Sequence, residues 1–120
     1  MKVKHWTLSN GATCLVAGIE SSTLTCIDFW CKAGSVYERQ KEEGMAHFLE
    51  HMIFKGSKNL QEGEFDLKIE SLGGSSNAAT GLDDVHYYVL IQPKDIEKAL
   101  NLLLDLLLFP EIKQDAFDIE

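Results

Sequence analysis

The fold is decided by the stretch Met45-Ala46-His47-Phe48-Leu49-Glu50-His51-Met52-Ile53, because the spacing of apolar residues changes there. Its apolar residues recur three and four positions apart, which is typical of one face of a helix. Gly56, shortly beyond, offers a C-terminal cap. The sequence therefore predicts a helix that starts near Glu43.

On the N-terminal side of this helix the sequence has the pattern of strands. β-Branched and aromatic residues are enriched there, and Asn10-Gly11 supplies the chemistry of a tight turn. We predict a hairpin and then a third strand, at Val3–Leu8, Thr13–Ile19 and Thr23–Lys32.

On the C-terminal side, helical and strand patterns alternate. The predicted order is a helix, two strands and two further helices, at Glu62–Leu72, Ser75–Thr80, Val85–Gln92, Pro93–Leu108 and Gln114–Glu120. Within the fourth of these segments, Ile96–Leu108 is apolar almost all round, so we expect this helix to be deeply buried. This arrangement predicts an α+β fold, in which helices pack on one face of an antiparallel sheet.

The composition fits one small globular domain. The chain has 120 residues, of which 45% are hydrophobic and 25% are charged, as in ordinary soluble domains. Its formal net charge is −8 at pH 7. We therefore expect neither a nucleic acid nor an anionic membrane surface as partner, because both require a basic face. The most apolar stretch, Ala99–Phe109, is too short to span a bilayer.

The three cysteines, Cys14, Cys26 and Cys31, do not indicate a disulfide framework. Their number is odd, and no pair has the C-x-x-C spacing of a metal or redox site. We expect them to be small buried hydrophobic residues in a reducing compartment. Because the N-terminus also lacks the apolar run of a signal peptide, the sequence predicts a cytoplasmic protein.

His47 and His51 lie four residues apart in the predicted helix. That spacing puts both imidazoles on one face, roughly 5–6 Å apart at Cβ, where both could bind one zinc ion. Glu50 could accept a proton from a water whose pKa zinc lowers to about 7. The order H-x-x-E-H is a signature of one group of zinc peptidases. Two such histidines could instead be solvent-exposed or be satisfied core residues.

The surrounding segments resemble the active-site region of the pitrilysin-type (M16) metallopeptidases. The similar segments are Gly34-Ser35-Val36-Tyr37-Glu38, Gly44–Ser57, Gly73-Gly74, Asn77-Ala78-Ala79-Thr80 and Tyr87-Tyr88. The resemblance is nearest to the branch of mitochondrial processing peptidases and bacterial processing proteases, and it covers essentially the whole chain. It implies the N-terminal part of a pitrilysin-type domain with the LuxS/processing-peptidase-like fold.

The resemblance also implies roles for single residues. His47 and His51 would bind zinc, and Glu50 would be the general base that activates water. A substrate peptide would add as an extra strand at the segment Asn77-Ala78, where small residues allow a backbone to approach closely. Without the resemblance, that segment reads as an ordinary turn of small residues.

In the family, a glutamate on a later helix supplies the third zinc ligand. The resemblance places this ligand beyond Glu120, and Glu120 itself resembles a glutamate that supports the ligands from the same helix. Family members also have a second, similar half or a partner subunit that closes a chamber over the site. We therefore expect residues 1–120 to be a partial N-terminal metallopeptidase domain, truncated before the third ligand and inactive alone.

The sequence thus predicts a zinc-dependent endopeptidase of extended peptides, as part of a longer protein. The alternatives are a non-catalytic peptide-binding or assembly module of the same fold, or a fold fragment with no role of its own. We expect His5 and His86 to be surface or packing residues, and Glu38–Glu43 to be a solvated loop. If the leucine-rich helix at Leu100–Leu108 lacks its natural cover, its apolar surface would favour self-association.

Overall fold

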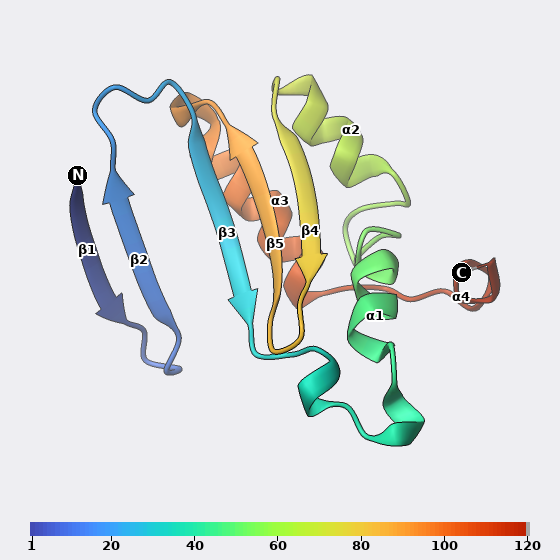
Figure 1. The fold of residues 1–120 in the computed structure, drawn as a ribbon. Helices are drawn as coiled ribbons and strands as arrows, with labels where there is room; N and C mark the ends of the chain where they lie inside the picture. The colour runs from blue at the N-terminus through green and yellow to red at the C-terminus, as the bar shows by residue number, and fades with distance from the viewer. Residues whose placement is uncertain (120) are drawn as a thin grey trace.

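The computed structural model describes residues 1–119, and Figure 1 shows its elements in space. The strands are β1 (Lys2–Thr7), β2 (Thr13–Gly18), β3 (Thr25–Cys31), β4 (Ser75–Thr80) and β5 (Val85–Ile91). The helices are α1 (Met45–Ile53), α2 (Glu64–Ser71), α3 (Ile96–Leu108) and α4 (Gln114–Ile119), with short 3-10 turns at Ser35–Tyr37, Gln40–Glu42 and Pro93–Asp95. The predicted elements are therefore present, with slightly different ends.

The strands form two antiparallel sheets rather than one. β1 and β2 pair as a hairpin, whereas β3, β5 and β4 form a three-stranded sheet in that order. β5 is therefore the central strand, and β4 lies at an edge. In Figure 1 the hairpin lies beside β3, on the far side of this sheet from β4. The fold is α+β with antiparallel sheets, as the sequence predicts.

The core lies between the three-stranded sheet and the helices. α3 contacts β3 and β5, whereas α1 and α2 contact β4. Alternate residues of β5 face the helices, so its burial follows a two-residue period. Most of the buried side chains come from β5, α2 and α3, and α1 contributes Ile53; the core includes Val85, Tyr87, Val89, Ile91, Phe65, Ile69, Ala99, Leu103 and Leu106. Helices thus cover one face of the sheet.

The prediction that the leucine-rich helix is deeply buried is wrong. Only Ala99, Leu103 and Leu106 of α3 are buried, and Leu108 is 63% exposed. The sheet covers one face of α3, and α2 also contacts this helix, but the outer face of α3 stays partly exposed. That outer face lines an open groove of about 790 Å³, together with side chains from α2 and the preceding loop.

The prediction of buried cysteines is also wrong. All three cysteines are free, Cys26 and Cys31 are exposed, and Cys14 is half-buried. Successive side chains of β3 point to opposite faces of the sheet. Ile27 and Phe29 point toward the core, so Cys26 lies on the opposite face. The cytoplasmic location stays a prediction. None of the helices within residues 1–119 is long and apolar enough to cross a membrane.

Candidate metal and peptide site

The helix that carries both histidines begins at a cap formed by the side chain of Glu38, in the loop that precedes it. The Glu38 carboxylate accepts hydrogen bonds from the backbone amides of Gly44 and Ala46, at 2.7 and 2.9 Å. A carboxylate satisfies free amides at a helix N-terminus and interacts favourably with the helix dipole. Glu38 is therefore a structural cap of α1, and the interpretation of this acidic residue as part of a solvated loop is wrong.

The loop that carries Glu38 is held against the turn between β4 and β5. Gly34 is buried with φ of 123°, and a Cβ atom there would lie only 2.6 Å from the Gly81 carbonyl oxygen. The Val36 amide donates to the Leu82 carbonyl at 2.8 Å. This contact requires glycine at position 34. It brings the start of α1 and the end of β4 to the same place.

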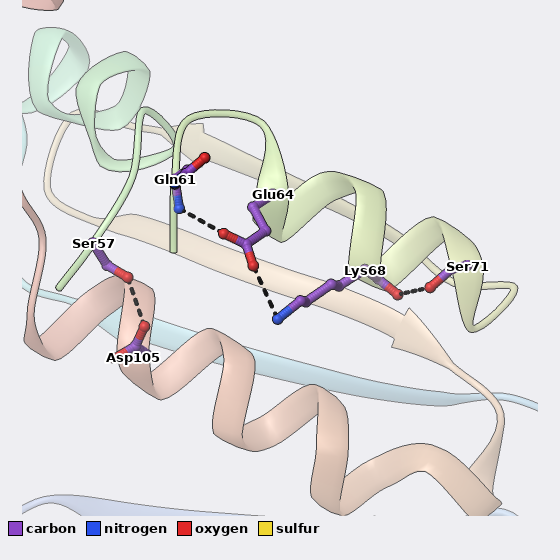
Figure 2. A network of polar contacts seen from close by, with 6 residues as sticks. All are labelled: Ser57, Gln61, Glu64, Lys68, Ser71 and Asp105. Atoms are coloured by element: carbon purple, nitrogen blue, oxygen red, sulfur yellow. Dashed lines mark hydrogen bonds and ion pairs between the residues drawn. The ribbon is translucent and has the colours of Figure 1, made fainter. Parts of the chain in front are cut away.

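The segment after α1 is tied to α3. Ser57 Oγ donates to Asp105 Oδ2 at 2.6 Å, as Figure 2 shows, and Asn59 Nδ2 donates to Asp105 Oδ1 at 2.8 Å. Ser57 is 3% exposed, so its hydroxyl is satisfied inside the protein. Both ends of α1 are thus anchored by side chains from other elements.

The two histidines converge at their nitrogen atoms. Nε2 of His47 lies 3.2 Å from Nε2 of His51, and the ring planes are 84° apart. Two nitrogens bound to one tetrahedral zinc ion at about 2.0–2.1 Å would lie about 3.3–3.4 Å apart. Both side chains are exposed, so they are not satisfied core histidines. The pair therefore fits the geometry of two ligands on one metal ion.

Two ligands alone do not complete a zinc site. Within residues 1–119, no group of three or more His, Cys, Asp or Glu residues is placed to hold a metal ion. The predicted role of Glu120 lies outside the described residues. Zinc sites normally have at least three protein ligands, so among the described residues His47 and His51 form an incomplete set.

Glu50 connects α1 with the edge strand. Its side chain is half-buried, and Oε2 accepts a hydrogen bond from Thr80 Oγ1 at the end of β4. Thr80 and His47 line one cavity of about 420 Å³, together with the helix cap Glu38. Thr80 belongs to the motif Asn77-Ala78-Ala79-Thr80, but no local sequence pattern indicates that its hydroxyl contacts Glu50.

Asn77 and Ala78 lie in β4, which confirms the strand predicted at Ser75–Thr80 and excludes the alternative of an ordinary turn. They pair with Tyr88 and Tyr87 of β5, and no described strand pairs with the other side of β4. The Ala78 amide donates to Oδ1 of Asn77 at 2.8 Å. The structure therefore brings the predicted peptide-binding segment to a sheet edge, beside the helix that carries the histidines.

The tyrosine opposite Ala78 belongs to the core beneath the site. Tyr87 is 4% exposed, and its ring lies 6.2 Å from that of Phe54, just after α1. Burial raises the pKa of Tyr87 to about 12, with further contributions from the negative charges of Cys31 and Glu50. Tyr87 is therefore a neutral packing residue at neutral pH.

His86 takes no part in the histidine pair. Its ring stacks on Trp30 with centroids 4.0 Å apart, and Nδ1 lies 3.0 Å from Asp28 Oδ1. It therefore packs against side chains of the three-stranded sheet, as the sequence predicts.

The order H-x-x-E-H is a signature of one group of zinc peptidases, and here the helix that carries it contacts the edge strand of an antiparallel sheet. The family described as "Insulinase (Peptidase family M16)" matches residues 16–120. This chain belongs to peptidase family M16.

Individual proteins agree with this assignment. The chain is 40% identical over 101 residues to the human mitochondrial-processing peptidase subunit beta, covering 79% of this chain and 21% of that protein. It is 36% identical over 112 residues to the zinc protease PqqE of Helicobacter pylori, covering 92% of this chain and 25% of that protein.

A solved structure has the same fold. The crystal structure of a protease from Helicobacter pylori superimposes with a TM-score of 0.90 and 34% sequence identity, covering 95% of this chain and 28% of that one. The chain thus spans between a fifth and a quarter of the length of the curated relatives above.

Proposed function

We propose that this chain carries the metal-binding and water-activating part of a zinc endopeptidase that cleaves extended peptides. The observation that carries the proposal is the 3.2 Å separation of the two Nε2 atoms of His47 and His51, on the helix that also presents Glu50. The zinc protease name of one relative agrees with this choice of metal. The complete enzyme would be a longer protein, because the chain spans only part of its relatives.

In this proposal each residue has a distinct task. His47 and His51 would hold zinc, which when bound would lower the pKa of a water to about 7 and polarise the scissile carbonyl. Glu50 takes the proton of the attacking water and returns it to the leaving amine. Glu50 is half-buried and bonded to Thr80, which lines a cavity together with His47, and this position agrees with the role.

The substrate peptide would pair with the free edge of β4. Backbone hydrogen bonds at a sheet edge bind an extended peptide with little dependence on its sequence. The Ala78 amide now donates to the side chain of its neighbour Asn77. A bound peptide would supply a carbonyl in place of that side-chain oxygen, so Asn77 would act as a placeholder for the substrate.

A second half or a partner subunit would supply the rest of the site. The human relative is named as a subunit of its peptidase, and a third zinc ligand is not among residues 1–119. The alternative function is a peptide-binding or assembly module of the same fold without catalysis. The intact set of His47, Glu50 and His51 favours the peptidase.

The test is the substitution Glu50→Gln in the longer protein. We expect peptide hydrolysis to be lost while zinc, measured by atomic absorption, stays bound, because the amide cannot take up the proton but leaves both imidazoles in place. Hydrolysis at the wild-type rate would remove Glu50 as the base. A wild-type protein that binds peptides but cleaves none would instead support the non-catalytic module.

A further inference from the structure

The edge strand β4 reaches two helices through two hydroxyl groups on one face. Ser76 Oγ donates to Oδ1 of Asp66 in α2 at 3.1 Å, and Thr80 Oγ1 donates to Oε2 of Glu50 in α1. Side chains four residues apart in a strand point to the same side, and all four of these residues are half-buried. Both are hydrogen bonds from a hydroxyl group to a carboxylate. Only the bond from Thr80 has Glu50, the proposed base, as its acceptor.

A glutamate on a helix surface can adopt several staggered rotamers of similar energy. A hydroxyl donor from a neighbouring strand selects one rotamer, because a hydrogen bond to a charged acceptor is stronger than one between neutral groups. Here the donor comes from β4, thirty residues away in the sequence. The bond ends on Oε2 of Glu50, and its donor Thr80 lines a cavity together with His47.

We propose that Thr80 is a positioning residue for Glu50, and that it couples the base to the strand that binds the substrate. β4 carries both the candidate peptide edge at Asn77-Ala78 and the hydroxyl that holds the base. A peptide that pairs with this edge is therefore positioned relative to the Glu50 carboxylate, because the same short strand holds both. This inference rests on the proposed function.

The test compares Thr80→Val, Thr80→Ser and Ser76→Ala in the longer protein. Valine keeps the shape and strand preference of threonine but removes the donor, whereas serine keeps the donor. Ser76→Ala removes the equivalent bond to α2 and serves as the matched control. We expect kcat to fall about 10–100-fold in Thr80→Val, as for other groups that orient catalytic residues, with KM within about twofold of wild type. Thr80→Ser should recover most of the loss, and Ser76→Ala should leave kcat unchanged.

A second measurement does not depend on turnover. In the zinc-free chain, three-bond NMR couplings should report one χ1 rotamer of Glu50 in the wild type, Thr80→Ser and Ser76→Ala, and an averaged value in Thr80→Val. A single rotamer in every variant would overturn the proposal, as would equal kcat in Thr80→Val and Ser76→Ala. If Thr80→Val does not fold, the wild type and Thr80→Ser are compared with Thr80→Ala in the same measurements.

The outcomes separate the two proposals. If the wild type cleaves peptides, Glu50→Gln does not, and Thr80→Val behaves as wild type, only the role of Thr80 is wrong. If the wild type cleaves nothing while the Glu50 rotamer depends on Thr80, the contact exists but the proposed function is wrong.

Discussion

At the scale of single residues, the chemistry of the site depends on where a few atoms point. The four-residue spacing of His47 and His51 puts both on one helical face, and their Nε2 atoms meet at 3.2 Å. Both side chains are exposed, so a metal ion can reach the two Nε2 atoms and replace the contact between them. Glu50 lies between them in sequence but is directed toward β4.

The histidine pair predicts weak but specific zinc binding by the 120-residue chain. Because a zinc site normally has at least three protein ligands, equilibrium dialysis should detect only weak binding. His51→Ala should lower the affinity about tenfold or more, since it removes one of two ligands. His5→Ala, which alters an exposed histidine on β1, is the matched control. Equal affinities in the two variants would place the metal elsewhere.

The buried phenol of Tyr87 predicts a loss of stability at alkaline pH. Its pKa rises from 10.0 to about 12 on folding, so between these values the unfolded chain has released a proton that the folded chain retains. Stability therefore decreases as pH rises, by up to about 3 kcal/mol for this group.

Urea unfolding at pH 9 and at pH 12 measures this effect by comparison with Tyr87→Phe, which cannot ionise. We expect the wild type to lose more stability than the variant over this interval. The same loss in both proteins would show that Tyr87 does not contribute.

At the scale of elements, α1 is positioned by contacts at both of its ends. Glu38 caps its first amides, and Ser57 binds Asp105 of α3 beyond its last turn. The neighbouring helix α2 is ordered by similar means. Glu64 accepts hydrogen bonds from the Gln61 amide and the Lys68 ammonium (Figure 2), and the amide bond is the main cause of its lowered pKa. These anchors hold the histidine helix against the edge strand.

Removal of the Glu38 cap is predicted to lower the stability of the folded chain. Glu38→Ala should lower the free energy of unfolding by about 1–2 kcal/mol, because two amides of the first turn lose their acceptor and the helix dipole loses a favourable charge. Glu43→Ala, in the same acidic segment and exposed, should change it by less than about 0.5 kcal/mol. Chemical denaturation measures both. A similar cost for the two variants would mean that Glu38 is not a cap.

At the scale of the whole molecule, the helices cover one face of a three-stranded sheet and leave the outer side of α3 open. Leu102, Leu104, Leu108 and Phe109 line that groove, with Lys68 and Lys98 also in its lining. An apolar groove of about 790 Å³ on a small chain is a site where a further segment or a second molecule can bind.

The exposed side of α3 predicts self-association of the 120-residue chain. Sedimentation equilibrium should show a mass that rises with protein concentration, because association buries apolar surface. Leu108→Lys should shift the protein toward the monomer. Leu67→Lys changes a leucine that is similarly exposed, on α2, and should leave association unchanged. A wild type that stays monomeric up to millimolar concentration would show that the groove does not drive association.

The sequence by itself determined the identity of the elements, the α+β class and the histidine pair. These features depend on periodicities of two and of three to four residues, and on a spacing of four within one helix, so neighbours along the chain are sufficient to define them. The edge position of Asn77-Ala78 was implied only by the family resemblance and by no local pattern. The tertiary structure alone decided that the N-terminal hairpin forms its own sheet and that α3 buries only one face.

Tertiary structure also decided which side chains support the site. Thr80 meets Glu50 across thirty residues of sequence, and Ser57 meets Asp105 across forty-eight. Glu38 is closer in sequence to the helix that it caps, but only the folded loop turns its carboxylate toward the first amides. Contacts of this kind depend on how separate elements pack together, because a local pattern fixes which face a side chain lies on but not what lies opposite it.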